Sequence, residues 1–196
     1  IIQLDPDVKL LVTSREALGL PEEWLYPIEG LPTPQSHQAD NIESNTAVAL
    51  FVERARQVRP GFSLVDNRAS VVRICQLVDG LPLAIEMAAS WTKTLRCAEI
   101  AAEIQQNLNF LTSNLRHAPE RHRSMQAVLA QTWAHLTASE QDLFARLAVF
   151  RGGFRRKAAT VIAGASLPLL SSLLDKCLLR REAGGRYQIH ELLRQY

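Results

Sequence analysis

The sequence predicts a mainly α-helical fold, with a short α/β segment at its beginning and one β-hairpin near its end. Three observations carry this prediction. Apolar residues recur at helical spacing through most of residues 46–177. A short apolar run rich in β-branched residues stands near the N-terminus, and the period changes to that of strands around two glycines near the C-terminus. With 47% hydrophobic residues among 196, the chain has ample material for a buried core.

The first 32 residues have the pattern of the end of an α/β unit. Residues 9–13 predict a buried strand, and the polar residues Ser14 and Arg15 begin the loop that follows it. Open α/β sheets bind their ligands at loops of this kind. A second extended piece is expected at residues 24–28. Residues 32–45 contain two prolines and few apolar side chains, so they predict a domain boundary after residues 1–32.

A helical bundle is predicted for residues 33–113. Apolar residues fall at helical spacing in four successive stretches, near residues 47–55, 71–78, 83–91 and 98–107. Gly80 is well placed to end the second helix, and Pro82 is tolerated in the first turn of the third. The expectation for this domain is therefore four amphipathic helices in quick succession.

Residues 114–196 predict a second helical domain that ends in a hairpin. The polar stretch 114–123 indicates a linker, and helices are expected at residues 125–136, 138–147, 156–163 and 167–177. Thr137 and Glu140 have the spacing of a capping box, and Ser166 can cap the last of these helices. Strand-like residues 178–181 and 186–189 flank Gly184 and Gly185. Helices followed by one hairpin are typical of a winged-helix domain.

Composition narrows the class of function. Lys and Arg number 22 against 20 Asp and Glu, and the net charge of +2 gives no electrostatic case for nucleic acid or an anionic membrane. The three cysteines are far apart, without the spacing of a zinc site or a disulfide framework, which favours a reduced, cytoplasmic protein. No apolar run approaches the roughly 20 residues that span a bilayer, so no membrane partner is expected.

The turn formed by Gly80, Leu81 and Pro82 is one candidate ligand site. It lies between two predicted helices, where a proline ring offers a rigid apolar face and the first helical amides are free to bind an acceptor. A purine could pack there. The alternative is an ordinary helix corner, in which Gly80 supplies a positive φ and Pro82 begins the next helix.

Two further segments could contact phosphate. Thr13, Ser14 and Arg15 follow the predicted strand, where the Arg15 guanidinium could sense a γ-phosphate. His190 follows the hairpin, where it could donate to a β-phosphate or act as a latch between domains. The alternatives are a solvated arginine at a loop and a histidine that serves only an interface.

Taken in order, these segments resemble the second half of the NB-ARC module. The matching segments are residues 9–16 (KLLVTSRE), 80–86 (GLPLAIE) and 189–196 (IHELLRQY), and residues 46–55 (TAVALFVERA) are similar to the first lid helix. The module occurs in plant immune receptors, in apoptosome-forming proteins and in bacterial transcriptional regulators with a fused ATPase of the STAND class. The resemblance covers essentially the whole chain.

The resemblance implies a role for each segment. Thr13, Ser14 and Arg15 would form the sensor after the fourth strand of an α/β nucleotide-binding core, to which residues 1–32 would belong. Pro82 would pack on adenine, and His190 would contact the β-phosphate of ADP. Residues 33–113 would be the four-helix lid and residues 114–196 the winged helix. The implied cofactor is ADP or ATP.

The sequence departs from the family pattern in two ways. Ile189 and Glu191 stand where the family has Met and Asp, which leaves the latch role of the acidic position open. There is also no GxxxxGK[ST] loop and no apolar strand ending in paired acids, so the groups that cradle phosphates and hold Mg²⁺ are absent. A missing upstream half would hold the Mg²⁺ ion. The parent is expected to be a slow P-loop ATPase, and this segment alone should not hydrolyse ATP.

The resulting expectation is an ADP/ATP-dependent switch segment in a transcriptional regulator or a defence protein. Its expected partners are the upstream nucleotide-binding core of the same polypeptide and, on activation, further copies of itself; downstream sensor repeats are compatible with this interpretation. Both chain ends are abrupt, which suggests a longer parent.

Two other classes of function stay open. A DNA-binding winged helix is suggested by the fold and by Arg151, Arg155, Arg156 and Lys157. Direct DNA binding is not the expectation, because the recognition-helix equivalent at residues 167–177 is mostly leucine and serine. An enzyme with a Ser/His/Asp or Cys/His site has no supporting nucleophile elbow or metal-ligand spacing.

Overall fold

The fold was analysed in a computed structural model, which describes residues 8–14, 17–26, 28–36, 41–107, 110–112, 124–182 and 184–196. Most of its elements are helices, and a small three-stranded antiparallel sheet lies near the C-terminus. The first helices are α1 (Thr46–Val58), α2 (Arg68–Leu77), α3 (Pro82–Ser90) and α4 (Cys97–Gln106). The later elements are α5 (Met125–Ala134), α6 (Ala138–Leu147), β1 (Phe154–Arg155), α7 (Arg156–Ala163), α8 (Leu167–Asp175), β2 (Leu179–Arg181), β3 (Arg186–Ile189) and α9 (Glu191–Gln195). Short 3-10 helices are η1 (Ile42–Ser44), η2 (Val65–Asn67) and η3 (Trp91–Lys93).

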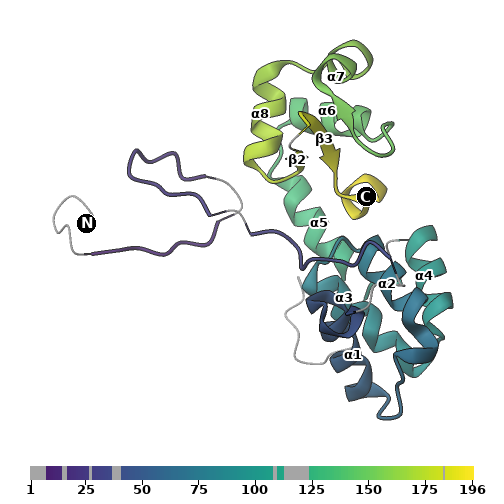
Figure 1. The fold of residues 1–196 in the computed structure, drawn as a ribbon. Coiled ribbons are helices and arrows are strands. Elements are labelled where there is room, and N and C mark those ends of the chain that lie inside the picture. Colours follow the sequence, from purple (N-terminus) through teal and green to yellow (C-terminus); the bar gives the residue numbers. More distant parts are fainter. Residues whose placement is uncertain are drawn as a thin grey trace.

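Helices α1 to α4 form the first group, which we call the bundle (Figure 1). Asn45 begins α1, because its side-chain Oδ1 accepts hydrogen bonds from the backbone N–H groups of Ala47 and Val48. Helix α1 packs on α3, and α2 packs on α4. An ion pair of 3.1 Å between Arg54 Nε and Glu86 Oε1 adds a polar link between α1 and α3. The apolar faces predicted from helical spacing are the faces buried here.

Helices α6 to α8 and the sheet form the second group, which we call the C-terminal group (Figure 1). Strand β3 is central, with Phe154 of β1 opposite Tyr187 and Leu179 of β2 opposite Ile189. Phe154, Tyr187 and Leu179 are buried against the helices. The predicted hairpin is therefore confirmed as β2 and β3. The two-residue strand β1 was not predicted, because it is too short to show a period of two.

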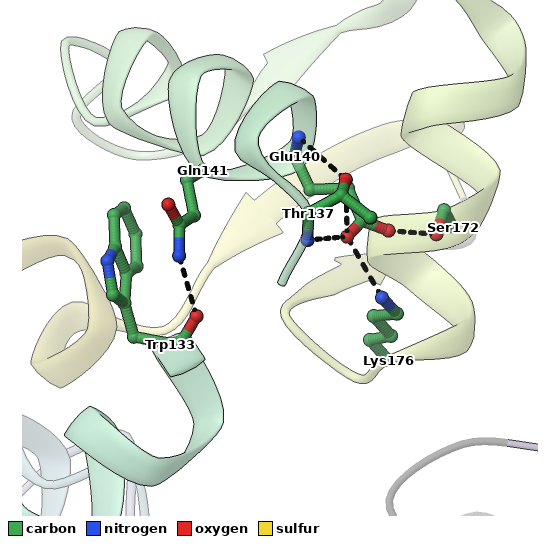
Figure 2. A network of polar contacts seen from close by, with 6 residues as sticks. All are labelled: Trp133, Thr137, Glu140, Gln141, Ser172 and Lys176. Atoms are coloured by element: carbon green, nitrogen blue, oxygen red, sulfur yellow. Dashed lines mark hydrogen bonds and ion pairs between the residues drawn. The ribbon is translucent and has the colours of Figure 1, made fainter. Parts of the chain in front are cut away.

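A buried carboxylate ties α6 to α8 in the C-terminal group (Figure 2). The Glu140 side chain accepts hydrogen bonds from the Thr137 backbone N–H at 2.7 Å, from the Lys176 ammonium at 2.9 Å and from the Ser172 hydroxyl. The predicted capping box at Thr137 is confirmed. Burial alone would raise the pKa of Glu140, but the hydrogen bonds from Ser172, Lys176 and Thr137 outweigh it and lower the pKa to about 2.

Helices α5 and α9 connect the two groups. Met125 and Leu129 of α5 are buried in the bundle core, whereas Leu136, just after α5, is buried in the C-terminal core. Leu192 of α9 is fully buried in the bundle core, although it follows the sheet of the C-terminal group. Figure 1 shows α9 lying between the two groups. Tyr196, which follows α9, contacts Trp133 of α5, with ring centroids 5.9 Å apart.

The predicted α/β segment is not found in the described part of residues 8–36. These residues contain no helix or strand, and residues 8–14 and 17–26 reach away from both groups (Figure 1). Leu11 and Trp24, which a buried strand would cover, are 99% and 97% exposed. A strand forms only beside another strand that satisfies its backbone N–H and C=O groups, and no described strand lies next to the segment. The strand predicted at residues 9–13 is therefore wrong, and the described residues of the extended piece expected at 24–28 form no strand either.

The coarse fold class can be compared with the structure. The predicted mainly helical character is confirmed. The predicted linker at residues 114–123 lies outside the described residues. No single helix among the described residues is long and apolar enough to cross a membrane, although α7 and α8, bent by 113°, pass the same test as a pair.

Candidate functional site

The turn between α2 and α3 is the point where three separate parts of the chain meet. Helix α2 ends in two consecutive left-handed residues, Asp79 with φ of 49° and Gly80 with φ of 67°. The Gly80 N–H donates to the Cys75 carbonyl at 3.0 Å, which closes the helix end. Left-handed backbone is free for glycine and is tolerated by aspartate better than by most residues. The predicted role of Gly80 in ending the second helix is confirmed.

The first part that meets this turn is the segment before the bundle. The Leu31 N–H donates to the Gly80 carbonyl at 2.8 Å. The backbones approach so closely that a Cβ atom on Gly80 would lie 1.9 Å from the Leu31 carbonyl oxygen. A Cβ atom on Gly30 would lie 2.3 Å from the Asp79 carbonyl oxygen. Both glycines are therefore required by close packing, and Gly80 also by its φ.

The second part comes from the sheet of the C-terminal group. Arg180 of β2 donates from Nη1 to Asp79 Oδ2 at 3.0 Å. His190, directly after β3, places Nε2 3.5 Å from the same oxygen. One carboxylate of the bundle therefore faces two nitrogen groups of the C-terminal group. We call Asp79, Arg180 and His190 the junction triad.

The orientation of His190 follows from its place at the start of α9. His190 is the N-cap residue of α9, and its Nδ1 accepts the backbone N–H of Leu192 at 3.1 Å. An accepting Nδ1 carries no proton, so the proton of the neutral ring is on Nε2, which lies 3.5 Å from Asp79 Oδ2 without forming a hydrogen bond to it. The next residue but one, Leu192, is buried in the bundle core. His190 therefore connects the Asp79 carboxylate to the helix that enters the bundle.

The members of the triad differ in their access to solvent. The His190 side chain is 9% exposed, whereas those of Asp79 and Arg180 are 41% and 40% exposed. Water and ions reach the Asp79–Arg180 pair, so its attraction is screened by salt. The contact is accessible enough to be opened by an anion or by a change of charge.

The structure brings only some of the predicted site residues together. Gly80 is buried in the turn, Leu81 is half-buried against the bundle core, and Pro82 is exposed as the first residue of α3. His190 reaches this turn through Asp79. The turn and the histidine, 110 positions apart by their numbers 80 and 190, thus belong to one site.

The predicted sensor segment is not part of this site. Thr13 and Ser14 are exposed in the extended segment that reaches away from both groups (Figure 1). Arg15 lies outside the described residues. A loop of this kind is positioned by the strand before it, and no strand forms in the described residues here.

Sequence reasoning missed Asp79 and Arg180. The Asp-Gly pair at the end of a predicted helix was a usable signal, since a charged residue in a left-handed turn is held in a fixed direction. Arg180 carried no signal of its own, because its contact with Asp79 depends on how the sheet is placed against the bundle.

A second polar feature lies at the start of α7. Arg151, Arg155, Arg156 and Lys157 are all exposed within seven positions. Arg155 is paired opposite Arg186 in the sheet, and Arg186 donates to the carbonyls of Gly152 and Gly153. Cations at the N-terminus of a helix oppose the helix dipole, so a nearby anion would stabilise this arrangement.

Comparison with known proteins links the chain to bacterial regulators. No protein-family model matches it. It is 34% identical over 202 residues to a protein of Mycobacterium tuberculosis named as a predicted HTH-type transcriptional regulator, and equally identical to one of Mycobacterium bovis with the same name. Each match covers 97% of this chain and 22% of the relative. A second Mycobacterium tuberculosis protein, named only as uncharacterized, is 32% identical, with 97% of this chain and 49% of the relative covered. The chain thus spans less than half the length of these relatives.

Proposed function

We propose that this chain is the regulatory segment of a transcriptional regulator, in which bound ADP or ATP controls how the bundle is held against the C-terminal group. The names of the relatives support the role in transcription. They do not mention nucleotide. The nucleotide part of the proposal depends on the resemblance to the NB-ARC module and on the geometry of the turn between α2 and α3.

The observation that carries the proposal is the meeting of the Gly80-Leu81-Pro82 turn with His190 through Asp79. A ligand between these two places would touch both groups of the chain, so its presence would change their relationship. In this proposal residues 33–113, with α1 to α4, are the lid, and residues 114–196, with α5 to α9 and the sheet, are the winged helix. A ligand can shift such an arrangement only by binding one form better than the other.

The residues of the turn suit an adenine nucleotide. The exposed ring of Pro82 offers an apolar face for adenine, and His190 Nε2–H is a donor for a phosphate oxygen. The Asp79 carboxylate lies 3.5 Å from His190 Nε2. A phosphate bound by this nitrogen would therefore lie beside the carboxylate or displace it. Arg15 would sense the terminal phosphate. Phosphates and Mg²⁺ would be held by an upstream core of the same polypeptide, and ATP hydrolysis, where it occurs, would be carried out there.

The proposal includes partners outside this chain. The exposed apolar side chains of residues 10–28 would be covered by the upstream core. Self-association would follow when the two groups separate, because α9 and the faces it covers would become accessible. Downstream sensor repeats would act on the same contact between the bundle and the C-terminal group.

Equilibrium ADP binding by the longer parent protein tests this function. We expect Arg15→Ala, Pro82→Ala and His190→Ala each to weaken ADP binding, by about tenfold for the two residues that contact phosphate. His135→Ala is the matched control, since His135 is exposed at the end of α5. A parent protein that holds no nucleotide, or three variants with unchanged ADP affinity, would show that the chain is not a nucleotide-controlled segment.

Direct DNA binding by the C-terminal group is the second candidate, and the names of the relatives favour it over the nucleotide switch. The exposed basic residues at the start of α7 are the surface that would contact phosphates. Helix α8 opposes this function, because its exposed positions carry uncharged or acidic residues that give few phosphate contacts: Leu167, Pro168, Ser171 and Asp175.

Salt-dependent binding to duplex DNA tests the second candidate. If the C-terminal group binds DNA, affinity falls steeply between about 50 and 200 mM salt, and Arg155→Glu with Arg156→Glu weakens it by about tenfold or more. The control is Arg56→Glu, an exposed arginine of the bundle. Equal loss in the control, or no measurable binding at low salt, eliminates direct DNA binding by this chain.

A further inference from the structure

We propose that the junction triad is an electrostatic latch with Asp79 as its switch residue, and that it holds α9 and the C-terminal group against the bundle without any ligand. This goes beyond the proposed function, because the latch would operate in the free chain. It assigns a regulatory role to Asp79 and Arg180, two residues outside the nucleotide-binding set.

The backbone around Asp79 holds its carboxylate in place before the C-terminal group arrives. Asp79 and Gly80 are both left-handed, and the turn is closed by the hydrogen bond to Cys75. The backbone of Gly30 and Leu31 packs directly against the backbone of the turn. The backbone of the turn is held by these contacts, so little backbone entropy is lost when Asp79 forms its ion pair.

The two nitrogen contacts of the triad, one of them an ion pair, end on the same oxygen. Arg180 Nη1 and His190 Nε2 lie 3.0 and 3.5 Å from Asp79 Oδ2. Removing the charge of Asp79 therefore weakens the contacts from β2 and from the end of β3 together. Removing Arg180 weakens one of them and leaves the histidine contact.

Helix α9 couples the triad to the bundle core. His190 lies with Nε2 3.5 Å from Asp79 Oδ2, while its Nδ1 accepts the Leu192 N–H and its carbonyl accepts the Arg194 N–H at 3.0 Å. These bonds hold the first turn of α9, which carries Leu192 into the bundle core. When Asp79 no longer holds the ring, the cap loosens and Leu192 leaves the core more often.

Amide hydrogen exchange of the nucleotide-free, 196-residue chain tests the latch. Asp79→Asn removes the charge but keeps a residue that tolerates the left-handed backbone. We expect it to speed exchange at the Leu192 and Arg194 amides by about two- to fivefold at low salt, the range of a partly exposed ion pair. Amides of α6, which are distant from the triad, should be unchanged. The matched control is Asp142→Asn, which removes an ion pair with Arg146 inside the C-terminal group.

A double-mutant cycle with Arg180→Gln separates a latch from a general loss of stability. The latch predicts that Arg180→Gln speeds exchange in α9 and that its effect is smaller in the Asp79→Asn background. It also predicts that raised salt mimics the Asp79 variant in the wild type. Unchanged exchange in α9, or fully additive effects of the two substitutions, would overturn the latch. If Asp79→Asn unfolds the bundle, Arg180→Gln and the salt series decide the question alone. Since no nucleotide is present, failure here leaves the nucleotide proposal to its own test.

Discussion

Arg180 Nη1 lies 3.0 Å from Asp79 Oδ2, although 101 positions separate the two residues in the sequence. The contact joins the turn after α2 to strand β2, which follows α8. It exists only when the bundle and the C-terminal group are both folded and correctly placed. The Asp79–Arg180 pair therefore reports directly on how the bundle and the C-terminal group are positioned relative to each other.

Gly80 should not tolerate a side chain. Alanine there would combine a left-handed φ of 67° with a Cβ atom 1.9 Å from the Leu31 carbonyl oxygen. We expect Gly80→Ala to lower the free energy of unfolding by at least about 2 kcal/mol, measured by chemical denaturation. Gly61→Ala is the control, because that position has open space around it and should be near neutral. Equal effects at both positions would contradict the close approach of residues 30–31.

Glu140 should make the C-terminal group sensitive to acid. Its pKa is lowered from the usual 4.5 to about 2, so the folded state binds its proton less readily than the unfolded state. The stabilisation is fully present above pH 4.5 and is lost as the pH falls from 4.5 toward 2. We expect Glu140→Gln to reduce stability by about 1–3 kcal/mol at pH 7 and by much less near pH 2, measured by urea unfolding. Asp142→Asn, an exposed i,i+4 pair, should change stability by no more than about 0.5 kcal/mol.

Leu192 should contribute to the bundle although it belongs to α9. Its side chain is fully buried in the bundle core, so Leu192→Ala should lower the free energy of unfolding by about 2–4 kcal/mol. Leu167→Ala is a suitable comparison, because Leu167 is 58% exposed at the start of α8. Thermal unfolding followed by circular dichroism measures both. A Leu192 variant as stable as the Leu167 variant would mean that α9 does not enter the bundle.

The three cysteines should react at very different rates. Burial raises the pKa of Cys75 to about 12 and that of Cys97 to about 11, so neither forms a thiolate near neutral pH. Cys177 is exposed. A thiol reagent at pH 8 should therefore modify one group quickly in the folded chain and three after denaturation. Cys177→Ser should abolish the fast reaction, and a fast reaction that persists in this variant would place Cys75 or Cys97 at the surface.

The helices could be predicted from sequence because their signals are local. Apolar spacing locates α1, and the Thr137–Glu140 capping box marks the start of α6. The strand prediction for residues 9–13 was wrong because a strand needs a neighbouring strand to pair with. No local sequence pattern guarantees such a neighbour. No local signal placed Leu192 in the bundle core, because that position depends on how α9 lies against distant helices.

Only part of the candidate site was visible in the sequence. Gly80 and Pro82 were marked by their effect on the backbone, and His190 by its resemblance to a family motif. Asp79 and Arg180 were not, because each is an ordinary charged residue until the sheet is set against the turn. Their pairing is a tertiary contact and follows no sequence spacing.

The distance between the bundle and the C-terminal group in the parent protein tests the central claim most directly. Spin labels at Cys177 and at an introduced cysteine replacing the exposed Ala69 of α2 would report this distance by pulsed EPR. We expect a single narrow distribution with ADP and a shifted or broadened one with ATP, and Asp79→Asn should broaden the ADP distribution. One unchanged distribution with ADP, with ATP and without nucleotide would contradict the account.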